Sequence, residues 1–289
     1  MSVISNNTLA GSSGQGGSGY EIERSLRFNE GDSPYLSWTP SSAGNQKTYT
    51  HSAWLKRADV DTGRQNWFSA IPTGSNYVQF YFNANKIRLT FRYNGGTAYV
   101  LDTVALFRDT SAWYHVVVAV DSTQATSTDR VKIYVNGVNT PYTGTVFPQD
   151  SDTTINSAVQ HAISSYQPYA NGVYFNGYMA DVHFIDGQAL TPTDFGEYDN
   201  NNVWQPKAYA GTYGTNGFHL DFSDNSSNAA LGTDTSGNGN DWTVNNITHN
   251  STLNSFNLDV TSTPFTDTGR GLTITNNGSV GTTSAGACI

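Results

Sequence analysis

The sequence is poor in cysteine and in charged side chains. It contains one cysteine, Cys288, among 289 residues, so an internal disulfide is excluded and the fold must rest on packing alone. Charged residues make up 13% of the chain, against about a quarter in an average soluble protein, so solubility must come from Asn, Ser, Thr and Gly. The 14 basic residues are scattered and the net charge is −9, which argues against nucleic acid as a partner, because a phosphate-binding face needs concentrated Lys and Arg.

Long apolar runs are also lacking. No stretch approaches the length that a membrane span requires. The first residues, MSVISNNTLAGSSGQGG, contain neither the basic region nor the apolar region of a signal peptide. We therefore expect a protein that is made in a cytoplasm, is not exported by the usual route and has no membrane partner.

What the chain does contain is a series of β-strand patterns, and the clearest lies at 113–137, WYHVVVAVDSTQATSTDRVKIYVNG. Both faces of an extended chain would be mostly apolar at 113–120, which is typical of a fully buried strand. Residues 131–135 alternate between apolar and wetter side chains, as in a strand with one buried face. Asn136-Gly137 follows, and this dipeptide favours a type I′ hairpin turn, which needs positive φ at both central positions.

Further strand patterns recur about every ten residues between 49 and 104, with turn residues at each gap. They include 54–55, 67–68, 77–82, 87–93 and 98–104. Such spacing is typical of an antiparallel sandwich. A short helix is expected only at 190–198, where Thr191 could cap it and Pro192 would take its first position.

Four segments resemble, in the same order, motifs of laminin-G-like domains, whose fold is the concanavalin A-like jelly roll. They are SLRFNEGDSPYLS at 25–37, YTHSAWLKR at 49–57, WYHVVVAVD with VKIYVNGV at 113–138, and FNGYMADVHFIDGQAL at 175–190. The resemblance implies an all-β protein with an antiparallel β-sandwich at 20–200. A Gly/Ser-rich N-terminal arm, 1–19, would precede the sandwich, and a C-terminal β extension, 201–289, would pack on it.

The C-terminal region leaves other arrangements open. The segment DTSGNGNDWTV at 234–244 lies before the first strand in many laminin-G-like proteins, whereas here it follows the last. The strands after residue 200 could instead complete the sandwich in a permuted order, or be the relic of a truncated second copy. We expect one extension packed on the main sandwich.

Enzymatic activity is not expected. Glucanases with this fold use an E-x-D-x-x-E strand, but Tyr35 and Asn202 stand where the second glutamate would follow Glu30 and Glu197. The 6 histidines are dispersed, and no serine sits in a G-x-S-x-G elbow. A polysaccharide-degrading enzyme is therefore the weakest hypothesis, and the histidines at 115 and 183 are interpreted as structural.

Calcium is the most plausible cofactor, because the resemblance implies one ion at the sandwich rim and oxygen ligands suit a hard cation. The candidate ligands are Asp234, Asn238, Asn240 and Asp241. Asp121 or Asp181 could assist elsewhere. The alternative for 234–241 is an Asx-rich turn that satisfies its own backbone.

Glycan binding would require exposed aromatic rings beside polar groups. The candidates by composition are Tyr166, Tyr169, Trp204 and Tyr213. Tyrosines at strand ends are more often packing residues, which is the alternative for each of them.

The whole chain, including its leader, the stretch GYEIERSLRF and the D-x-S-G-N-G-N-D-W segment, resembles structural proteins of marine tailed bacteriophages. This resemblance implies a non-enzymatic protein of the virion surface, made in the host cytoplasm. It would be either a knob-like capsid decoration with weak glycan adhesion or a tail-fibre module that recognises host glycans. A fibre usually has coiled-coil heptads or a β-helical repeat, and the lack of both favours decoration.

The N-terminal arm is the candidate anchor on the capsid or on another virion protein. Apolar residues would fill small pockets and glycines would let the backbone lie flat. The anchoring candidates are Val3, Ile4, Leu9, Gly11, Gly14, Gly16 and Gly17. A disordered leader is the alternative.

Overall fold

The computed structural model describes residues 19–60, 63–93, 95–166 and 173–248, together with the backbone of three short strands between 265 and 282. The chain forms two units, residues 1–249 and 250–289. The strands of the first unit are β1 (Leu26–Phe28), β2 (Tyr35–Trp38), β3 (Thr48–Arg57), β4 (Arg64–Thr73), β5 (Asn76–Asn83), β6 (Lys86–Arg92), β7 (Tyr99–Thr103), β8 (Tyr114–Asp121), β9 (Val131–Val135), β10 (Val138–Asn139), β11 (Tyr142–Gly144), β12 (His161–Ile163), β13 (Gly177–Asp186), β14 (Gly196–Tyr198), β15 (Trp204–Pro206), β16 (Phe218–Leu220) and β17 (Thr243–Asn245). The second unit contains the antiparallel strands β18 (Phe265–Asp267), β19 (Leu272–Ile274) and β20 (Val280–Thr282).

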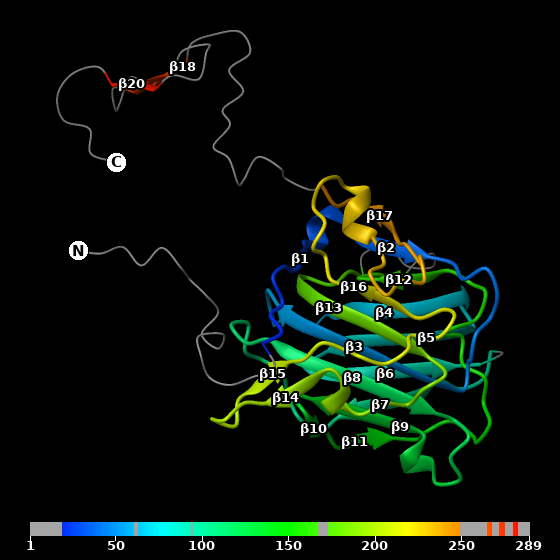
Figure 1. Cartoon of the computed structure of the whole chain (residues 1–289). Helices are drawn as coiled ribbons and strands as arrows, with labels where there is room; N and C mark the ends of the chain where they lie inside the picture. Colours follow the sequence, from blue (N-terminus) through cyan, green and yellow to red (C-terminus); the bar gives the residue numbers. More distant parts are fainter. Residues whose placement is uncertain are drawn as a thin grey trace. The chain divides into compact units, whose positions relative to one another are not determined.

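Two antiparallel sheets pack face to face in the first unit, with β13, β3 and β8 in one layer and β4, β5 and β6 in the other (Figure 1). The 7-stranded sheet has the order β1-β13-β3-β8-β9-β10, with β16 also pairing with β13. The 8-stranded sheet has the order β11-β7-β6-β5-β4-β12-β2-β17, and β14 and β15 form a separate hairpin. The prediction of an all-β jelly-roll sandwich is confirmed.

The hairpin predicted at Asn136-Gly137 is confirmed in detail. Strand β8 lies between β3 and β9 in the sheet, and residues 115–120 are all buried, so both of its apolar faces are covered as predicted. Asn136 and Gly137 have φ angles of 49° and 80°, the left-handed values that a type I′ turn requires. The Asn136 side-chain oxygen also accepts a hydrogen bond from the His115 backbone N–H at 2.8 Å, which ties the turn to β8.

Aromatic rings fill the space between the sheets. Phe68 of β4 is fully buried and its ring packs against His51 of β3, with ring centroids 4.4 Å apart and planes 7° apart. Phe184 of β13 and Phe218 of β16 lie 6.1 and 6.5 Å from Phe68, so residues distant in sequence meet at one point of the core. Packing of this kind replaces the disulfides that the chain cannot form.

The chain after residue 200 contributes to both sheets. Strand β16 pairs with β13, and β17 pairs with β2 at the edge of the other sheet. The expected extension, 201–289, is therefore divided: its part up to Asn245 completes the sandwich, and residues 250–289 form a unit of their own.

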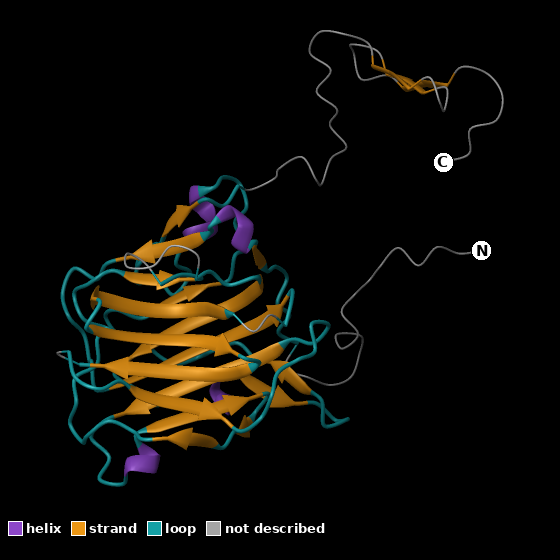
Figure 2. Ribbon diagram, turned by 180° about the vertical axis from the view of Figure 1, so that it is seen from behind, coloured by secondary structure: helices purple, strands orange, loops and turns teal. Residues whose placement is uncertain are grey.

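Among the described residues of the first unit, helical structure is limited to single 3₁₀ turns (Figure 2). They are η1 (Glu30–Asp32), η2 (Ser127–Asp129), η3 (Pro192–Asp194) and η4 (Ala229–Gly232). Within the described ranges, no helix combines the length and the apolar character that crossing a membrane requires.

Candidate functional site

An irregularity in β13 creates the most unusual polar site in the sandwich. The pairing of β13 with β3 shifts register between Ala180 and His183, and Asp181 at this bulge has a φ of 50°. On the other side of β13, β1 pairs with 177–179 and β16 with 182–184, so Asp181 lies where the neighbouring strand changes. Left-handed backbone is uncommon for residues other than glycine, and bulges often redirect a side chain at functional sites.

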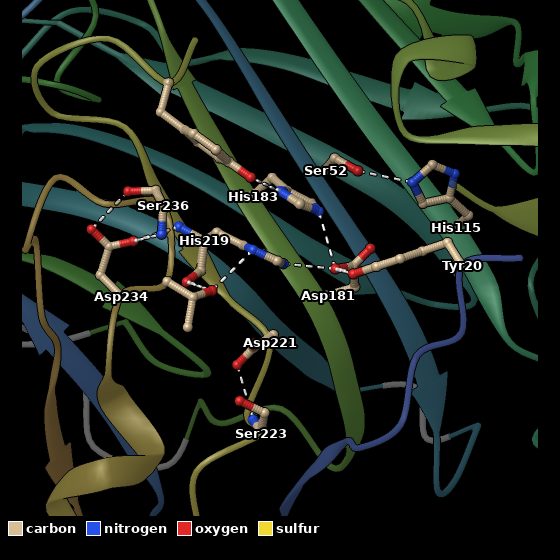
Figure 3. Close-up of polar contacts among 12 residues, drawn as sticks. Tyr20, Ser52, His115, Asp181, His183, His219, Asp221, Ser223, Asp234 and Ser236 are labelled. Atoms are coloured by element: carbon tan, nitrogen blue, oxygen red, sulfur yellow. Dashed lines mark hydrogen bonds and ion pairs between the residues drawn. The ribbon is translucent and has the colours of Figure 1, made fainter. Parts of the chain in front are cut away.

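Two histidines converge on the Asp181 carboxylate (Figure 3). His183 of β13 and His219 of β16 are directly paired, so their rings stack with centroids 4.1 Å apart. The Asp181 Oδ1 lies 2.7 Å from His219 Nε2 and 3.2 Å from His183 Nε2. It also accepts a hydrogen bond from the Tyr20 hydroxyl at 2.8 Å, so the first part of the described chain closes over the site.

The outer nitrogens of both rings meet hydroxyl groups. His183 Nδ1 lies 3.0 Å from the Tyr213 hydroxyl, and His219 Nδ1 lies 3.0 Å from Thr235 Oγ1. Two buried atoms inside the cluster have no hydrogen-bond partner among the described residues, namely Asp181 Oδ2 and His183 Nε2; the latter is close to the carboxylate without forming a hydrogen bond to it. Buried polar atoms without partners are rare in folded proteins and point to an unfilled requirement.

The electrostatics of the cluster favour an ionised Asp181. Burial alone would raise the pKa of Asp181, but His183 and His219 outweigh it and hold that pKa well below its usual range. Burial lowers the pKa of His183 against the opposing effect of Asp181, so this imidazole is neutral near pH 7. Burial also raises the pKa values of Tyr20 and Tyr213, so both phenols keep their protons.

Ser52 and His115 form a second constellation on the same sheet, which superficially resembles a nucleophile and its base (Figure 3). Ser52 Oγ lies 2.8 Å from His115 Nε2, and Trp204 Nε1 donates to His115 Nδ1 at 3.0 Å. An indole nitrogen can only donate, so His115 Nδ1 carries no proton. Because burial lowers the pKa of His115 to about 3, the neutral ring carries its one proton on Nε2 and donates it to Ser52. His115 therefore cannot take the Ser52 proton.

The comparison with family profiles supplies the identification. Residues 30–195 match the profile described as "Concanavalin A-like lectin/glucanases superfamily". The chain belongs to this superfamily.

Solved structures with the superfamily fold are similar to the sandwich, at low identity. They include a SAP-like pentraxin from Limulus polyphemus, with 16% identity over 60% of this chain and 80% of that one and a TM-score of 0.42. A putative carbohydrate binding protein from Bacteroides ovatus has 17% identity over 73% of this chain and 56% of that one, with a TM-score of 0.47. Domain 4 of the arabinanase AbnA from Geobacillus stearothermophilus, in complex with arabinotriose, has 21% identity over 60% of this chain and 75% of that one, with a TM-score of 0.43. The search of curated proteins found no match.

Of the four residues predicted from composition as glycan contacts, the three that the structure describes lie in different surroundings. Trp204 is only 9% exposed, so it cannot offer a ring face to a sugar, and this prediction is wrong. Tyr213 contacts the histidine cluster, and the Tyr166 ring packs edge-on against Tyr77 at 5.7 Å. Tyr169 lies outside the described residues.

A different tyrosine offers an exposed ring. Tyr178 of β13 is 38% exposed, with the Arg27 guanidinium 5.3 Å from its ring centroid and the Trp113 ring 6.5 Å away. Cross-strand pairing places Arg27 of β1 on one side of Tyr178 and Lys56 of β3 on the other. Arg27 lies over the Tyr178 ring and donates hydrogen bonds to the Gly177 carbonyl and the Asn176 side chain, so an aromatic ring and a basic group are held together at this surface.

The side chains of the loop predicted to bind calcium form hydrogen bonds within the loop and to the neighbouring segment 214–219. The Asp234 carboxylate accepts hydrogen bonds from the backbone N–H groups of His219, Ser236 and Asn240 at 2.8 to 2.9 Å. Asp241 Oδ1 accepts from the Asp234 N–H at 2.8 Å. The Asn238 and Asn240 amides donate to backbone carbonyls of 214–217. These bonds favour the Asx-turn alternative, and calcium binding at this loop stays a prediction.

The anchoring candidates, Val3, Ile4, Leu9, Gly11, Gly14, Gly16 and Gly17, lie outside the described residues. The cluster of Asp181, His183 and His219 was missed as a unit, although D-x-H within one strand pattern was a partial clue. The pairing of β13 with β16 carried no sequence signal, because the two paired histidines are separated by 36 residues and a loop.

Proposed function

We propose that this protein is a non-enzymatic structural protein of a bacteriophage virion surface, which displays its superfamily sandwich and docks on the capsid, or on another virion protein, through residues 1–19. One observation carries this proposal: the Tyr20 hydroxyl, directly after the expected arm, bonds to Asp181 of the sandwich, and the sandwich strands that the structure describes lie between Leu26 and Asn245. The chain is therefore fixed to the sandwich at Tyr20, and residues 1–19 are the segment that we propose binds the partner.

Two further features support a non-catalytic role. The superfamily profile covers lectins as well as glucanases, and this chain lacks the paired glutamates of the glucanase strand. In the Ser52 and His115 pair the imidazole donates its proton to the serine, whereas a catalytic base accepts the proton of its nucleophile. A decoration protein needs neither a glucanase glutamate pair nor an activated serine. The resemblance of this chain to phage structural proteins extends over the leader and the D-x-S-G-N-G-N-D-W segment.

Deleting residues 2–17 is expected to abolish incorporation into virions while leaving the sandwich folded. The deletion removes none of the strands that the structure describes, so the melting temperature should change by no more than about 2 °C, equivalent to about 0.5 kcal/mol in a domain of this size. Incorporation is measured by mass spectrometry of purified virions assembled with the truncated protein.

A matched control is a chain of full length in which Val3, Ile4 and Leu9 are replaced by serine. It keeps the length of the arm and loses its apolar side chains, so it should also fail to assemble if these fill pockets. Normal incorporation of the deleted protein would overturn anchoring by the arm.

The exposed ring of Tyr178 supports a second candidate function, adhesion to host glycans. The Arg27 guanidinium lies over one face of the Tyr178 ring, so a pyranose would stack on the other face, and single-ring stacking gives weak binding that many displayed copies would strengthen. Adhesion would be compatible with capsid decoration, and it would be the main task if the protein were a tail-fibre module.

Replacing Tyr178 with alanine is expected to weaken binding to any recognised glycan about tenfold, which corresponds to about 1.4 kcal/mol for the loss of one stacking ring. Full-length protein would be tested on a bacterial glycan array, followed by titration of the best binder. The matched control is Tyr198→Ala, because Tyr198 is 49% exposed and lies on the β14–β15 hairpin instead. Equal losses in the two variants, or none in Tyr178→Ala, would exclude this platform.

A further inference from the structure

We propose that Asp181, His183 and His219 bind one divalent transition-metal ion, zinc in the first place, which fastens β13 to β16. The three side chains offer one carboxylate oxygen and two imidazole nitrogens within 4.8 Å of one another. Two imidazoles with one carboxylate suit zinc and related metals, whereas calcium prefers an all-oxygen shell. The site is therefore distinct in position and chemistry from the predicted calcium loop at 234–241.

The distances fit a metal with small adjustments. Ligands about 2.1 Å from a tetrahedral ion lie about 3.4 Å from each other. His183 Nε2 is already 3.2 Å from Asp181 Oδ1, and His219 Nε2 at 2.7 Å would have to move outward by less than about 1 Å. The free Asp181 Oδ2 can supply the bond if the carboxylate turns, while Oδ1 keeps its contact with Tyr20.

The contacts around His219 orient its ring toward the Asp181 carboxylate. His219 Nδ1 lies 3.0 Å from Thr235 Oγ1, and His219 Nε2 faces Asp181 Oδ1 at 2.7 Å. A neutral imidazole can donate an Nε2 proton to this oxygen, and a metal ion at the site would take the place of that proton.

A metal satisfies more of the cluster than a proton does. A proton on His219 Nε2 would leave Asp181 Oδ2 and His183 Nε2 buried without hydrogen-bond partners. An ion in the same place would contact both. The hydroxyls of Tyr213 and Thr235 on the two Nδ1 atoms, and that of Tyr20 on the carboxylate, match the outer contacts that orient metal ligands in known sites.

Burial makes the site suited to a structural ion. Asp181 and His183 are each 1% exposed, and His219 is the only one of the three that reaches the surface. These three side chains leave the fourth position of a tetrahedral ion to a water molecule, and the burial of Asp181 and His183 keeps that position from a substrate, as a structural role requires. The ion would join β13 to β16. Because the Tyr20 hydroxyl bonds to Asp181, the ion would also hold the segment through which the chain enters the sandwich.

The test uses the full-length chain purified without a polyhistidine tag, dialysed against chelator and then loaded with Zn²⁺ or Co²⁺. We expect one zinc per chain by elemental analysis, a rise in melting temperature, and a Co²⁺ visible spectrum typical of imidazole and carboxylate ligands. His219→Gln and Asp181→Asn should each lower the zinc affinity more than tenfold. Tyr20→Phe, which keeps all three ligands, should lower it about tenfold or less.

Asp241→Asn is the matched control, because it makes the same carboxylate-to-amide change in the neighbouring loop, and it should bind zinc as the wild type does. Circular dichroism of the metal-free proteins shows whether each variant folds. If both ligand variants fail to fold, the Co²⁺ spectrum of the wild-type protein alone tests whether imidazole and carboxylate groups bind the metal. No metal uptake by the wild type, or equal uptake by folded His219→Gln, would overturn the proposal.

Discussion

Lowering the pH from 8 to 5 is expected to lower the free energy of unfolding of the sandwich by about 6 kcal/mol. Burial lowers the pKa of His51 and of His115 to about 3 and that of His161 to about 4, from an ordinary value of 6.5. Below pH 6.5 these three histidines therefore bind protons in the unfolded chain but stay unprotonated in the folded chain. The contribution of these neutral histidines to stability is complete above pH 6.5 and falls continuously as the pH drops toward about 3.

Each of these rings is held in a neutral form by its surroundings. His161 Nε2 accepts a hydrogen bond from the Asn156 backbone N–H at 2.8 Å, and a proton on that nitrogen would abolish it. His115 Nδ1 likewise accepts from Trp204. His51 lies flat on Phe68, and neither of its ring nitrogens has a hydrogen-bond partner among the described residues, so a charged ring there would be unsolvated.

The expected loss is large compared with the stability of a domain. At pH 5, about 1.5 pH units below the unfolded pKa, each histidine costs about 2 kcal/mol, and three together cost about 6 kcal/mol of a total of roughly 5–15. Urea unfolding at pH 8 and pH 5 measures the difference. His51→Leu removes one of the three groups and should shrink the pH difference by about 2 kcal/mol. A free energy of unfolding that is equal at both pH values would contradict the burial of neutral histidines.

The fold was predictable because its strongest sequence patterns are local. The β8 and β9 strands and the Asn136-Gly137 turn follow from alternation and from the positive φ of both turn residues. Thr191 and Pro192 likewise predict the start of η3, where the Thr191 N–H donates to Asp194 at 3.0 Å. The predicted helix is shorter than expected, because the chain returns to a strand at Gly196–Tyr198 and pairs with β15.

The site was not predictable in the same way, because long-range pairing creates it. The alternation of apolar and polar residues at β16 does not indicate which strand it pairs with. Its pairing with β13 brings His219 beside His183. Asp181 joins them only because a bulge gives it a φ of 50°. Composition also misjudged Trp204: an aromatic residue near a loop was interpreted as exposed, whereas the β14–β15 hairpin folds it onto the sheet.

Replacing Trp204 with alanine is expected to destabilise the sandwich by about 3–5 kcal/mol, the usual cost of truncating a buried tryptophan. The ring packs so closely on two glycines that a Cβ at Gly137 or at Gly196 would lie 2.5 Å from it. Tyr198 contacts the same ring edge-on, with centroids 4.8 Å apart. Denaturant unfolding measures the loss, which follows from the cavity and from the orphaned His115 Nδ1.

Two companion variants separate packing from hydrogen bonding and from exposure. Trp204→Phe keeps much of the ring volume but loses the donor to His115, so it should cost about 1–3 kcal/mol. Val203→Ala, at a side chain 51% exposed, should change stability by less than about 0.5 kcal/mol. If Trp204→Ala instead kept the wild-type stability and reduced glycan binding, the ring would be a binding platform. The burial of Trp204 beside His115 makes the structural outcome the expected one, because a ring enclosed by two glycines and a tyrosine has no free face for a sugar.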